Sequence, residues 1–202
     1  VVFLAAGTQS KAAVNMGVKQ TGAGSSYVDL AWDAQLGAGH YHTQFSQDGK
    51  NWIDMDNSSS PSESVYNLTQ GASYYARVVA YKGSHYTGTH VMIGVSETAI
   101  VSTKPTEVSG LTQTAAGVNS VSMSWNASAG AASYVIYGYI NYNWTQIGTS
   151  ATNSATITGV AATTSTRFSV AAVKNVTGGT VTGDQCSGVE MKAIPIKVSR
   201  IA

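Results

Sequence analysis

Polar and apolar residues alternate over many short segments of this chain. In Tyr27–Trp32 and in Ser120–Trp125 every second residue is apolar, and each segment ends on a tryptophan. Period-two alternation predicts strands with one buried face. The other segments with strand patterns are His40–Ser46, Trp52–Asp56, Ser64–Leu68, Tyr74–Lys82, His90–Val101, Ser133–Ile140, Trp144–Thr149, Ser154–Thr158, Thr166–Lys174 and Ser187–Ala193. No segment has a helical period, so the pattern predicts an all-β protein.

These strands occur in two successive copies. The segment that begins at Gly17 aligns without a gap to the one that begins at Gly110, and Trp32 aligns to Trp125 (125 − 32 = 93). A repeat of about ninety residues has the size of an independent sandwich domain and is too long for a solenoid unit. The repeat therefore predicts two tandem domains, residues 1–103 and 104–194.

The end of the chain leaves two interpretations open. The phrase that begins at Pro195 resembles the one that begins at Pro105, where the second copy starts. Residues 195–202 are therefore either a tail that continues the last strand or the start of a further repeat. We expect the chain to be part of a longer protein, with Val1–Ala6 as a strand or the end of a preceding segment.

Composition narrows the classes of partner. Charged residues are 10% of the 202 residues, and 11 Lys and Arg against 10 Asp and Glu give a net charge of +1. No positive field is available to attract nucleic acid or an anionic membrane, and no apolar run is long enough to span a bilayer. We expect no nucleic-acid partner and no membrane insertion. Cys186 is the only cysteine, so an intrachain disulfide cannot form.

Several landmarks resemble fibronectin type III domains over most of both copies. They are the early tryptophans, a tyrosine that opens the third strand of each copy (Tyr41, Tyr134), and the block from Leu68 to Ala80. The resemblance implies that Tyr74 makes a corner hydrogen bond to the backbone, whereas the second copy has Thr166 at that position. It also implies two tandem seven-stranded antiparallel β-sandwiches of the fibronectin type III or immunoglobulin-like class.

The function implied by the resemblance is a non-catalytic one. Proteins of this family serve as spacers, adhesion modules or accessory domains beside catalytic ones, and the phrase Val108–Thr114 resembles repeats of bacterial secreted and cell-surface proteins. We therefore expect a secreted or cell-surface spacer or adhesion module whose partners are its flanking domains and a glycan or surface protein. The alternative is a carbohydrate-binding accessory module of an extracellular glycan-degrading enzyme.

The sequence gives little support for catalysis. It contains no nucleophile elbow, no zinc-protease motif and no phosphate-binding loop. Asp54 and Asp56 lie two residues apart on a short strand, where an alternation would place both carboxylates on one face. Without a cleft beside them, such carboxylates are typical of a solvated acidic face, and we expect no enzyme and no cofactor.

All four histidines, His40, His42, His85 and His90, lie in the first copy. The alternation places His40 and His42 on the outer face of their strand. In the related sandwiches the loop that holds the other two lies near the start of that strand, so two or three imidazoles would meet, and imidazole is a ligand of transition metals. No carboxylate or thiol completes the set, so we expect exposed polar histidines rather than a metal site.

Aromatic residues form the candidate binding surface. The alternation leaves six tyrosine and tryptophan side chains on outer faces or in the hairpin: Tyr137, Tyr139, Tyr142, Trp144, Tyr75 and Tyr81. Flat rings on a sheet can stack on sugars or anchor another protein. Two interpretations stay open, because the same rings could instead pack on Arg and Lys side chains or on the adjoining domain.

Overall fold

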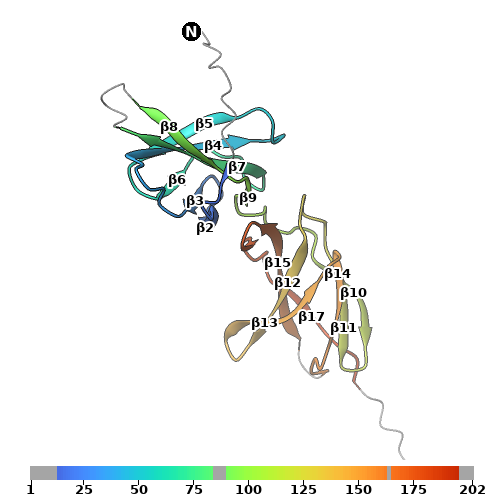
Figure 1. Cartoon of the computed structure of the whole chain (residues 1–202). Coiled ribbons are helices and arrows are strands. Elements are labelled where there is room, and N and C mark those ends of the chain that lie inside the picture. Colours follow the sequence, from blue (N-terminus) through green and yellow to red (C-terminus); the bar gives the residue numbers. More distant parts are fainter. Residues whose placement is uncertain (1–12, 84–89, 163–164, 196–202) are drawn as a thin grey trace, which may run out of the picture. The chain divides into compact units, whose positions relative to one another are not determined.

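The chain folds into two all-β units. We describe a computed structural model in which residues 13–83, 90–162 and 165–195 are described (Figure 1). Of these, unit 1 holds residues within 13–23, 27–67 and 73–101, and unit 2 holds 24–26, 68–72 and the remainder from 102 onward. The described residues form strands and no helix, so the predicted all-β fold class is confirmed. The domain limits 1–103 and 104–194 stay a prediction.

Unit 1 is built from two sheets. Its strands are β1 (Ala13–Val14), β2 (Lys19–Ala23), β3 (Val28–Ala31), β4 (His40–Ser46), β5 (Ile53–Ser58), β6 (Ser62–Val65), β7 (Ser73–Lys82), β8 (Val91–Ser96) and β9 (Ala99–Ser102). One sheet has the order β1-β8-β7-β4-β5, with β9 also paired to β7, and the other has the order β2-β3-β6. The pairing of β1 with β8 is parallel, and the β2–β3, β3–β6, β4–β5, β4–β7 and β7–β8 pairs are antiparallel.

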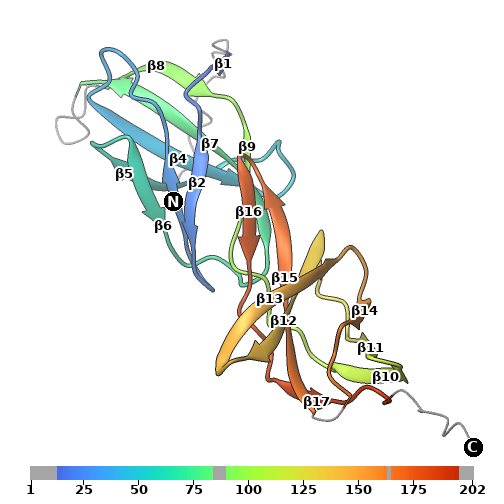
Figure 2. The same ribbon diagram turned by 90° about the horizontal axis from the view of Figure 1, so that it is seen from below.

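Unit 2 repeats this plan. Its strands are β10 (Thr112–Gly117), β11 (Ser120–Ser124), β12 (Ser133–Ile140), β13 (Asn143–Ser150), β14 (Ser154–Thr158), β15 (Thr166–Val176), β16 (Gly179–Thr182) and β17 (Val189–Met191). One sheet has the order β13-β12-β15-β16, with β17 also paired to β15, and the other has the order β10-β11-β14 (Figure 2).

The two units also share their irregularities. A register shift falls between Gln20 and Gly22 in unit 1 and between Gln113 and Ala115 in unit 2. A second one follows Thr43 in unit 1 and Ile136 in unit 2 (136 − 43 = 93). An extra residue in one strand bends that strand and increases its twist. The repeated sequence therefore encodes the bends of the sheets as well as the strands.

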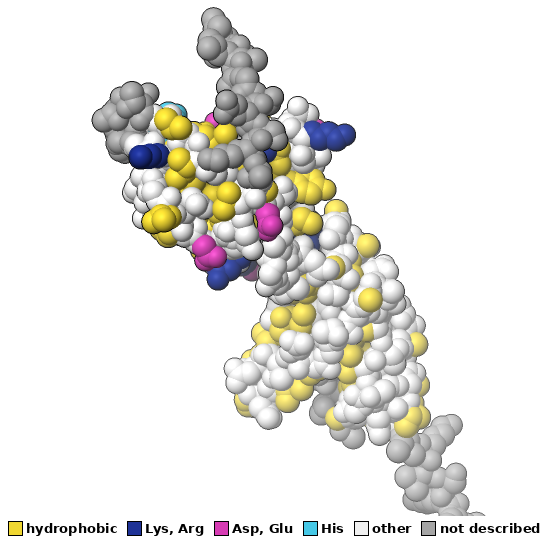
Figure 3. Space-filling model, viewed as in Figure 1, with side chains coloured by type: hydrophobic (Ala, Val, Ile, Leu, Met, Phe, Trp, Pro, Cys, Tyr) yellow, Lys and Arg dark blue, Asp and Glu magenta, His cyan; other side chains and the backbone are white. Residues whose placement is uncertain are grey.

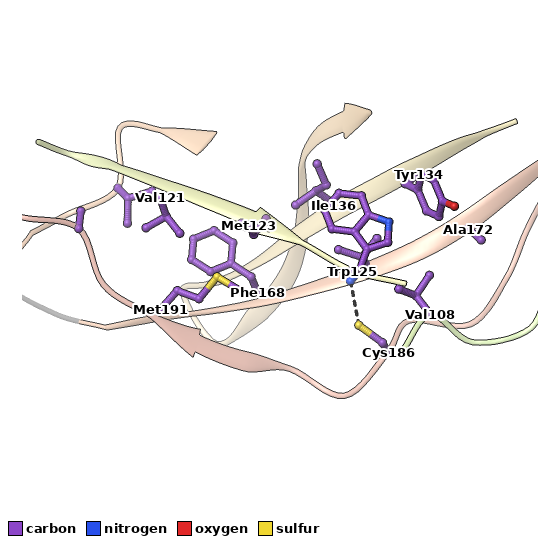
Figure 4. Close-up of a cluster of buried hydrophobic side chains, with 13 residues drawn as sticks. Val108, Val121, Met123, Trp125, Tyr134, Ile136, Phe168, Ala172, Cys186 and Met191 are labelled. Carbon is purple, nitrogen blue, oxygen red and sulfur yellow. Dashed lines mark hydrogen bonds between the residues drawn. The ribbon is translucent and has the colours of Figure 1, made fainter. Parts of the chain in front are cut away.

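Each unit closes around a tryptophan. Trp32 is 5% exposed and Trp125 is 3% exposed, so their predicted burial is confirmed. The Trp125 ring meets the Tyr134 ring edge-on with centroids 5.3 Å apart, and Trp32 meets Tyr41 in the same way at 5.4 Å. Figure 4 shows Trp125 and Tyr134 among the buried side chains of unit 2, with Ile136, Phe168 and Met191 from neighbouring strands.

The tyrosine of each pair also organises the loop before its strand. The Tyr134 hydroxyl accepts a hydrogen bond from the Ser128 backbone N–H at 3.0 Å. In unit 1 the Tyr41 hydroxyl accepts one from the Gln35 backbone N–H, also at 3.0 Å. A buried phenol requires a partner for its polar end, and here it satisfies a loop donor. The corner hydrogen bond expected of Tyr74 stays a prediction.

The last strand of each unit is broken, which the sequence did not predict. His90–Val101 was expected as one strand, but β8 ends at Ser96 and β9 begins at Ala99. In unit 2, β16 was missed and β17 is shorter than expected.

A side chain replaces a backbone acceptor at both breaks. The Ser96 hydroxyl accepts the Val78 N–H at 2.8 Å, and the Cys186 thiol sulfur accepts the Val170 N–H at 3.2 Å, the bond drawn in Figure 4. Because a side chain satisfies the donor of the neighbouring strand, the last strand can leave the ladder without an unpaired buried N–H.

Candidate binding surfaces

The β12–β13 hairpin of unit 2 carries a cross-strand pair of aromatic rings. Tyr139 lies directly opposite Trp144, and their ring centroids are 5.3 Å apart at an interplanar angle of 62°. Tyr139 is 39% exposed and Trp144 is 36% exposed. Aromatic pairs of this geometry stabilise a hairpin by up to about 1 kcal/mol. Each ring is thus held by the other and still offers an open edge or face to solvent.

The turn of this hairpin places a third aromatic ring in solvent. Ile140 pairs with Asn143, so Asn141 and Tyr142 form a two-residue turn, and their φ angles are 50° and 64°. Positive φ at both positions is the requirement of a type I′ turn, for which Asn-Gly is the preferred sequence. Asn tolerates this region, but a tyrosine there is strained. Tyr142 is nevertheless 89% exposed, so its ring does not compensate for the strain by packing.

A glycine from another segment supports Trp144. A Cβ atom added to Gly188 would lie 2.7 Å from Cη2 of Trp144 and 3.4 Å from Nε of Arg167. The indole therefore lies against the backbone at Gly188, beside the Arg167 guanidinium. Tyr137, which pairs with Gln146 on the same strands, is more covered than Tyr139. The structure thus brings Tyr139 and Trp144 together at the hairpin end, with Tyr142 in the adjacent turn and Tyr137 further along β12.

In unit 1 the predicted aromatic residues do not form a surface with each other. Tyr75 and Tyr81 are both on β7, but six residues of strand separate them by about 20 Å. Tyr75 lies against Gly49 in the β4–β5 loop and is 40% exposed. Tyr81 packs among histidine rings at the other end of the strand. The six residues therefore do not make up one platform.

An arginine network occupies the sheet face between these two tyrosines. The Arg77 guanidinium lies 4.1 Å from the centre of the Trp52 ring and donates from Nε to the Gln44 side-chain oxygen at 2.7 Å. Gln44 in turn donates to the Asp54 carboxylate at 2.7 Å. Burial lowers the pKa of Arg77, but it stays charged under ordinary conditions. Trp52, which is not one of the six candidate residues, thus packs its ring on an arginine.

The expectation that all of the histidines would be exposed is wrong for His40, which is only 3% exposed. Its position on the outer face follows the predicted alternation, but the Tyr81 ring stacks on it at 5.1 Å and 9°, and the His90 ring meets it edge-on at 5.3 Å. Neighbouring side chains on the outer face therefore bury it. His42 is half-buried and His90 is exposed, whereas His85 lies outside the described residues.

Asp54 and Asp56 do not form a carboxylate pair. Both are exposed, as expected. Asp54 pairs with Gln44 and Asp56 with Thr43, and the register shift between them breaks the alternation that would have placed both on one face. Asp54 is engaged by the Gln44 amide, and the Asp56 carboxylate accepts the backbone N–H of Asn57.

The described residues contain neither a candidate metal site nor a candidate membrane-spanning helix. Within residues 13–83, 90–162 and 165–195, no group of three or more His, Cys, Asp or Glu side chains is placed so that it could hold a metal ion. Over the same residues there is no helix long and apolar enough to cross a membrane. Charged side chains are few on the face shown in Figure 3, most visibly over unit 2.

The solved structures that the chain matches include two tandem-domain segments. The chain is similar to the FN1–FN3 domains of chicken CNTN1, with 14% identity and a TM-score of 0.48 over 90% of this chain and 68% of that one. It is also similar to a two-domain fibronectin type III segment of chicken tenascin, with 17% identity and a TM-score of 0.43 over 87% and 97% of the two chains.

A shorter match is to the twitchin kinase region of C. elegans, with 20% identity and a TM-score of 0.39 over 48% of this chain and 18% of that one. No protein-family model and no curated protein sequence matches the chain. The fold is a tandem β-sandwich. That assignment rests on the strand order and the paired tryptophan cores described above.

Proposed function

We propose that this chain is a non-catalytic spacer and adhesion module of a larger secreted or cell-surface protein, of bacterial origin. The low fraction of charged residues, the many Ser, Thr and Asn residues and the phrase Val108–Thr114 support this assignment. Its partners would be the flanking domains of the same polypeptide and a surface protein or glycan.

The spacer role is supported by the two self-contained cores. Each unit has its own two sheets and its own buried tryptophan, so each can hold its shape without the other. A domain with a closed core of this size folds without disulfides or metals. Such a module sets a distance between the segments attached to its ends.

The adhesive role depends on one observation, the aromatic hairpin of unit 2. Tyr142 occupies a position where glycine would relieve backbone strain, and its ring is almost fully exposed. Strained residues concentrate at functional sites, where binding compensates for the lost stability. Tyr139 and Trp144 beside it are rigid anchors with little side-chain entropy to lose on binding.

A second candidate is a carbohydrate-binding accessory module of an extracellular glycan-degrading enzyme. The half-exposed Trp144 ring supported by Gly188 favours it, because a flat ring fixed on a backbone surface can stack on the apolar face of a sugar. The adjacent Arg167 would supply hydrogen-bond donors for ring hydroxyls.

A comparison of binding to glycans and to cells tests both candidates. The whole chain would be applied to a glycan array and to bacterial and host cells, together with Trp144→Ala and Tyr142→Ala. The matched control is Tyr66→Ala, which removes a tyrosine of unit 1 that is 57% exposed. Array binding that both hairpin variants lose supports the carbohydrate candidate, and cell binding without array binding supports protein adhesion. Binding that is unchanged in both hairpin variants would contradict a role for the hairpin.

A further inference from the structure

The outer strand of the larger sheet in unit 2 is long and uncharged. β13 stands at the end of the order β13-β12-β15-β16, and among the described strands it pairs with β12 alone. With eight residues it is the longest of the described strands that end a sheet. Such an edge offers unpaired backbone N–H and C=O groups to another chain, and natural proteins commonly protect it with charges or proline. The sequence of β13 contains neither.

The equivalent edge of unit 1 carries two carboxylates. β5 ends its sheet as β13 does, and it holds Asp54 and Asp56. The pairing registers of the two hairpins are equivalent, so the same positions hold Gln146 and Gly148 in unit 2 (54 + 92 = 146, 56 + 92 = 148). Both edges contain the same register shift, so the shift does not distinguish them. Unit 1 thus protects with charge an edge that unit 2 leaves neutral.

The lack of charge extends over most of unit 2. No Lys, Arg, Asp or Glu residue occurs between Glu107 and Arg167, a stretch that includes β10 to β14. The equivalent residues of unit 1 are 15–74 (108 − 93 = 15, 166 − 92 = 74). They include two lysines and six acidic residues, which are Lys19, Lys50, Asp29, Asp33, Asp48, Asp54, Asp56 and Glu63. A neutral surface lacks the repulsion that keeps copies of a protein apart.

We propose that β13 pairs antiparallel with β13 of a second copy of this chain. A copy of the chain is a partner beyond those of the proposed function. A symmetric pair brings each residue of β13 close to the same residues of the other copy, so a neutral strand is compatible with itself. A strand with two aspartates, such as β5, would face its own charges. The pairing would join the two β13-β12-β15-β16 sheets into one continuous sheet.

The register of the hairpin identifies the groups that would bond across this edge. The turn is two residues long, so its closing pair, Ile140 and Asn143, is hydrogen-bonded. Hydrogen-bonded and non-hydrogen-bonded pairs alternate in an antiparallel ladder, so the backbone N–H and C=O groups of Trp144 and Gln146 point away from β12. The Trp144 ring lies against Gly188, next to β17, and therefore leaves the outer side of β13 uncovered.

Analytical ultracentrifugation of the whole chain over a range of concentrations tests the proposal. We expect a reversible monomer–dimer equilibrium, which is weak because one strand pair buries less surface than a standard interface. Hydrogen exchange of the Trp144 and Gln146 amides should slow as the dimer forms. Gln146 is exposed and near the middle of β13, so Gln146→Asp would bring two like charges close together. It should raise the dissociation constant at least about tenfold.

A charge reversal tests whether the pairing is symmetric. Gln146→Lys should also weaken the dimer, whereas an equimolar mixture of Gln146→Lys and Gln146→Asp should form a mixed dimer, because the charges are then opposite. The matched control is Thr158→Asp, which places the same charge at an exposed position of β14, an edge of the other sheet of unit 2. It should leave the dissociation constant unchanged. Backbone NMR spectra of each variant separate loss of pairing from loss of the fold.

Two results would overturn the proposal. The first is a folded chain that stays monomeric up to millimolar concentration. The second is a dimer that Gln146→Asp does not weaken, because another surface would then hold the two copies together. Binding to cells and glycans is a separate measurement on the same chain, so the pairing of β13 and the proposed adhesive role can fail independently.

Discussion

Replacing Tyr142 by glycine should stabilise unit 2 relative to replacing it by alanine. Both substitutions remove the same ring, which is 89% exposed, so they lose the same small packing contribution of about 0.5 kcal/mol. Only glycine relieves the strain of φ 64°, which is about 1 to 2 kcal/mol for a residue with a Cβ atom. Glycine also makes the unfolded chain more flexible, which offsets about 0.4 to 1 kcal/mol.

The midpoints of these two ranges give an expected difference between the two variants of about 0.8 kcal/mol in the free energy of unfolding of unit 2. For a domain of this size the difference corresponds to a shift in melting temperature of about 3 to 6 °C. Urea denaturation of the whole chain, followed by NMR signals of unit 2 core residues such as Ile136, measures it without interference from unit 1. Both variants should lose hairpin-dependent binding equally, because both lack the ring.

A Tyr142→Gly protein that is no more stable than Tyr142→Ala would refute the reasoning. The turn would then not impose the strain inferred from its φ angles, and the argument that function retains a tyrosine at this position would lose its basis. A Tyr142→Gly protein that is more stable than Tyr142→Ala and still binds would support the inferred strain but contradict the adhesive role of the Tyr142 ring.

Three further predictions follow from the cores, the β4–β5 loop and the glycine beside Trp144. Trp125→Ala should destabilise unit 2 by about 3 to 5 kcal/mol, because a large buried ring is lost from its core. The NMR signals of unit 1 should not change. Unfolding of both units together would contradict separate cores. Hydrogen bonds from the backbones of Asn51 and Lys50, the Asn51 side chain and Ser46 hold the pKa of Asp48 well below its usual 3.8. The ionised Asp48 carboxylate should therefore stabilise unit 1 above about pH 4, and this stabilisation should decrease as the pH falls further. In the Asp48→Asn variant, the stability of unit 1 measured by urea denaturation should depend less on acid pH. Gly188→Ala should displace the Trp144 ring and change its fluorescence, with little change in the free energy of unfolding of unit 2. An unaltered Trp144 fluorescence signal would show that the position of the ring does not depend on its contact with Gly188.

The sequence by itself was sufficient for most of the strands, for the number of sandwiches and for the tryptophan cores, although β1, β2, β10 and β16 were not predicted. Period-two alternation assigns alternate residues to opposite faces, and a repeat with a fixed offset applies one assignment to both copies. This is why His40–Ser46 was predicted with the bounds of β4, and why Trp32 and Trp125 were expected in two equivalent cores.

Only the tertiary structure decided what covers the outer faces. Alternation gives the face on which a side chain lies, but not which neighbours from other strands pack over it. His40 is therefore on the predicted face yet buried, because Tyr81 and His90 reach it from elements far along the chain. For the same reason Tyr75 and Tyr81 share a face but not a surface.

The breaks in the last strands also required the folded chain. Ser96 lies inside a predicted strand and Cys186 directly before one, and nothing local marks a hydroxyl or thiol that will accept an N–H from β7 or β15. The strain at Tyr142 has the same origin. A two-residue turn closes only when β12 and β13 pair in one register, and that pairing imposes a positive φ on whichever residue stands there.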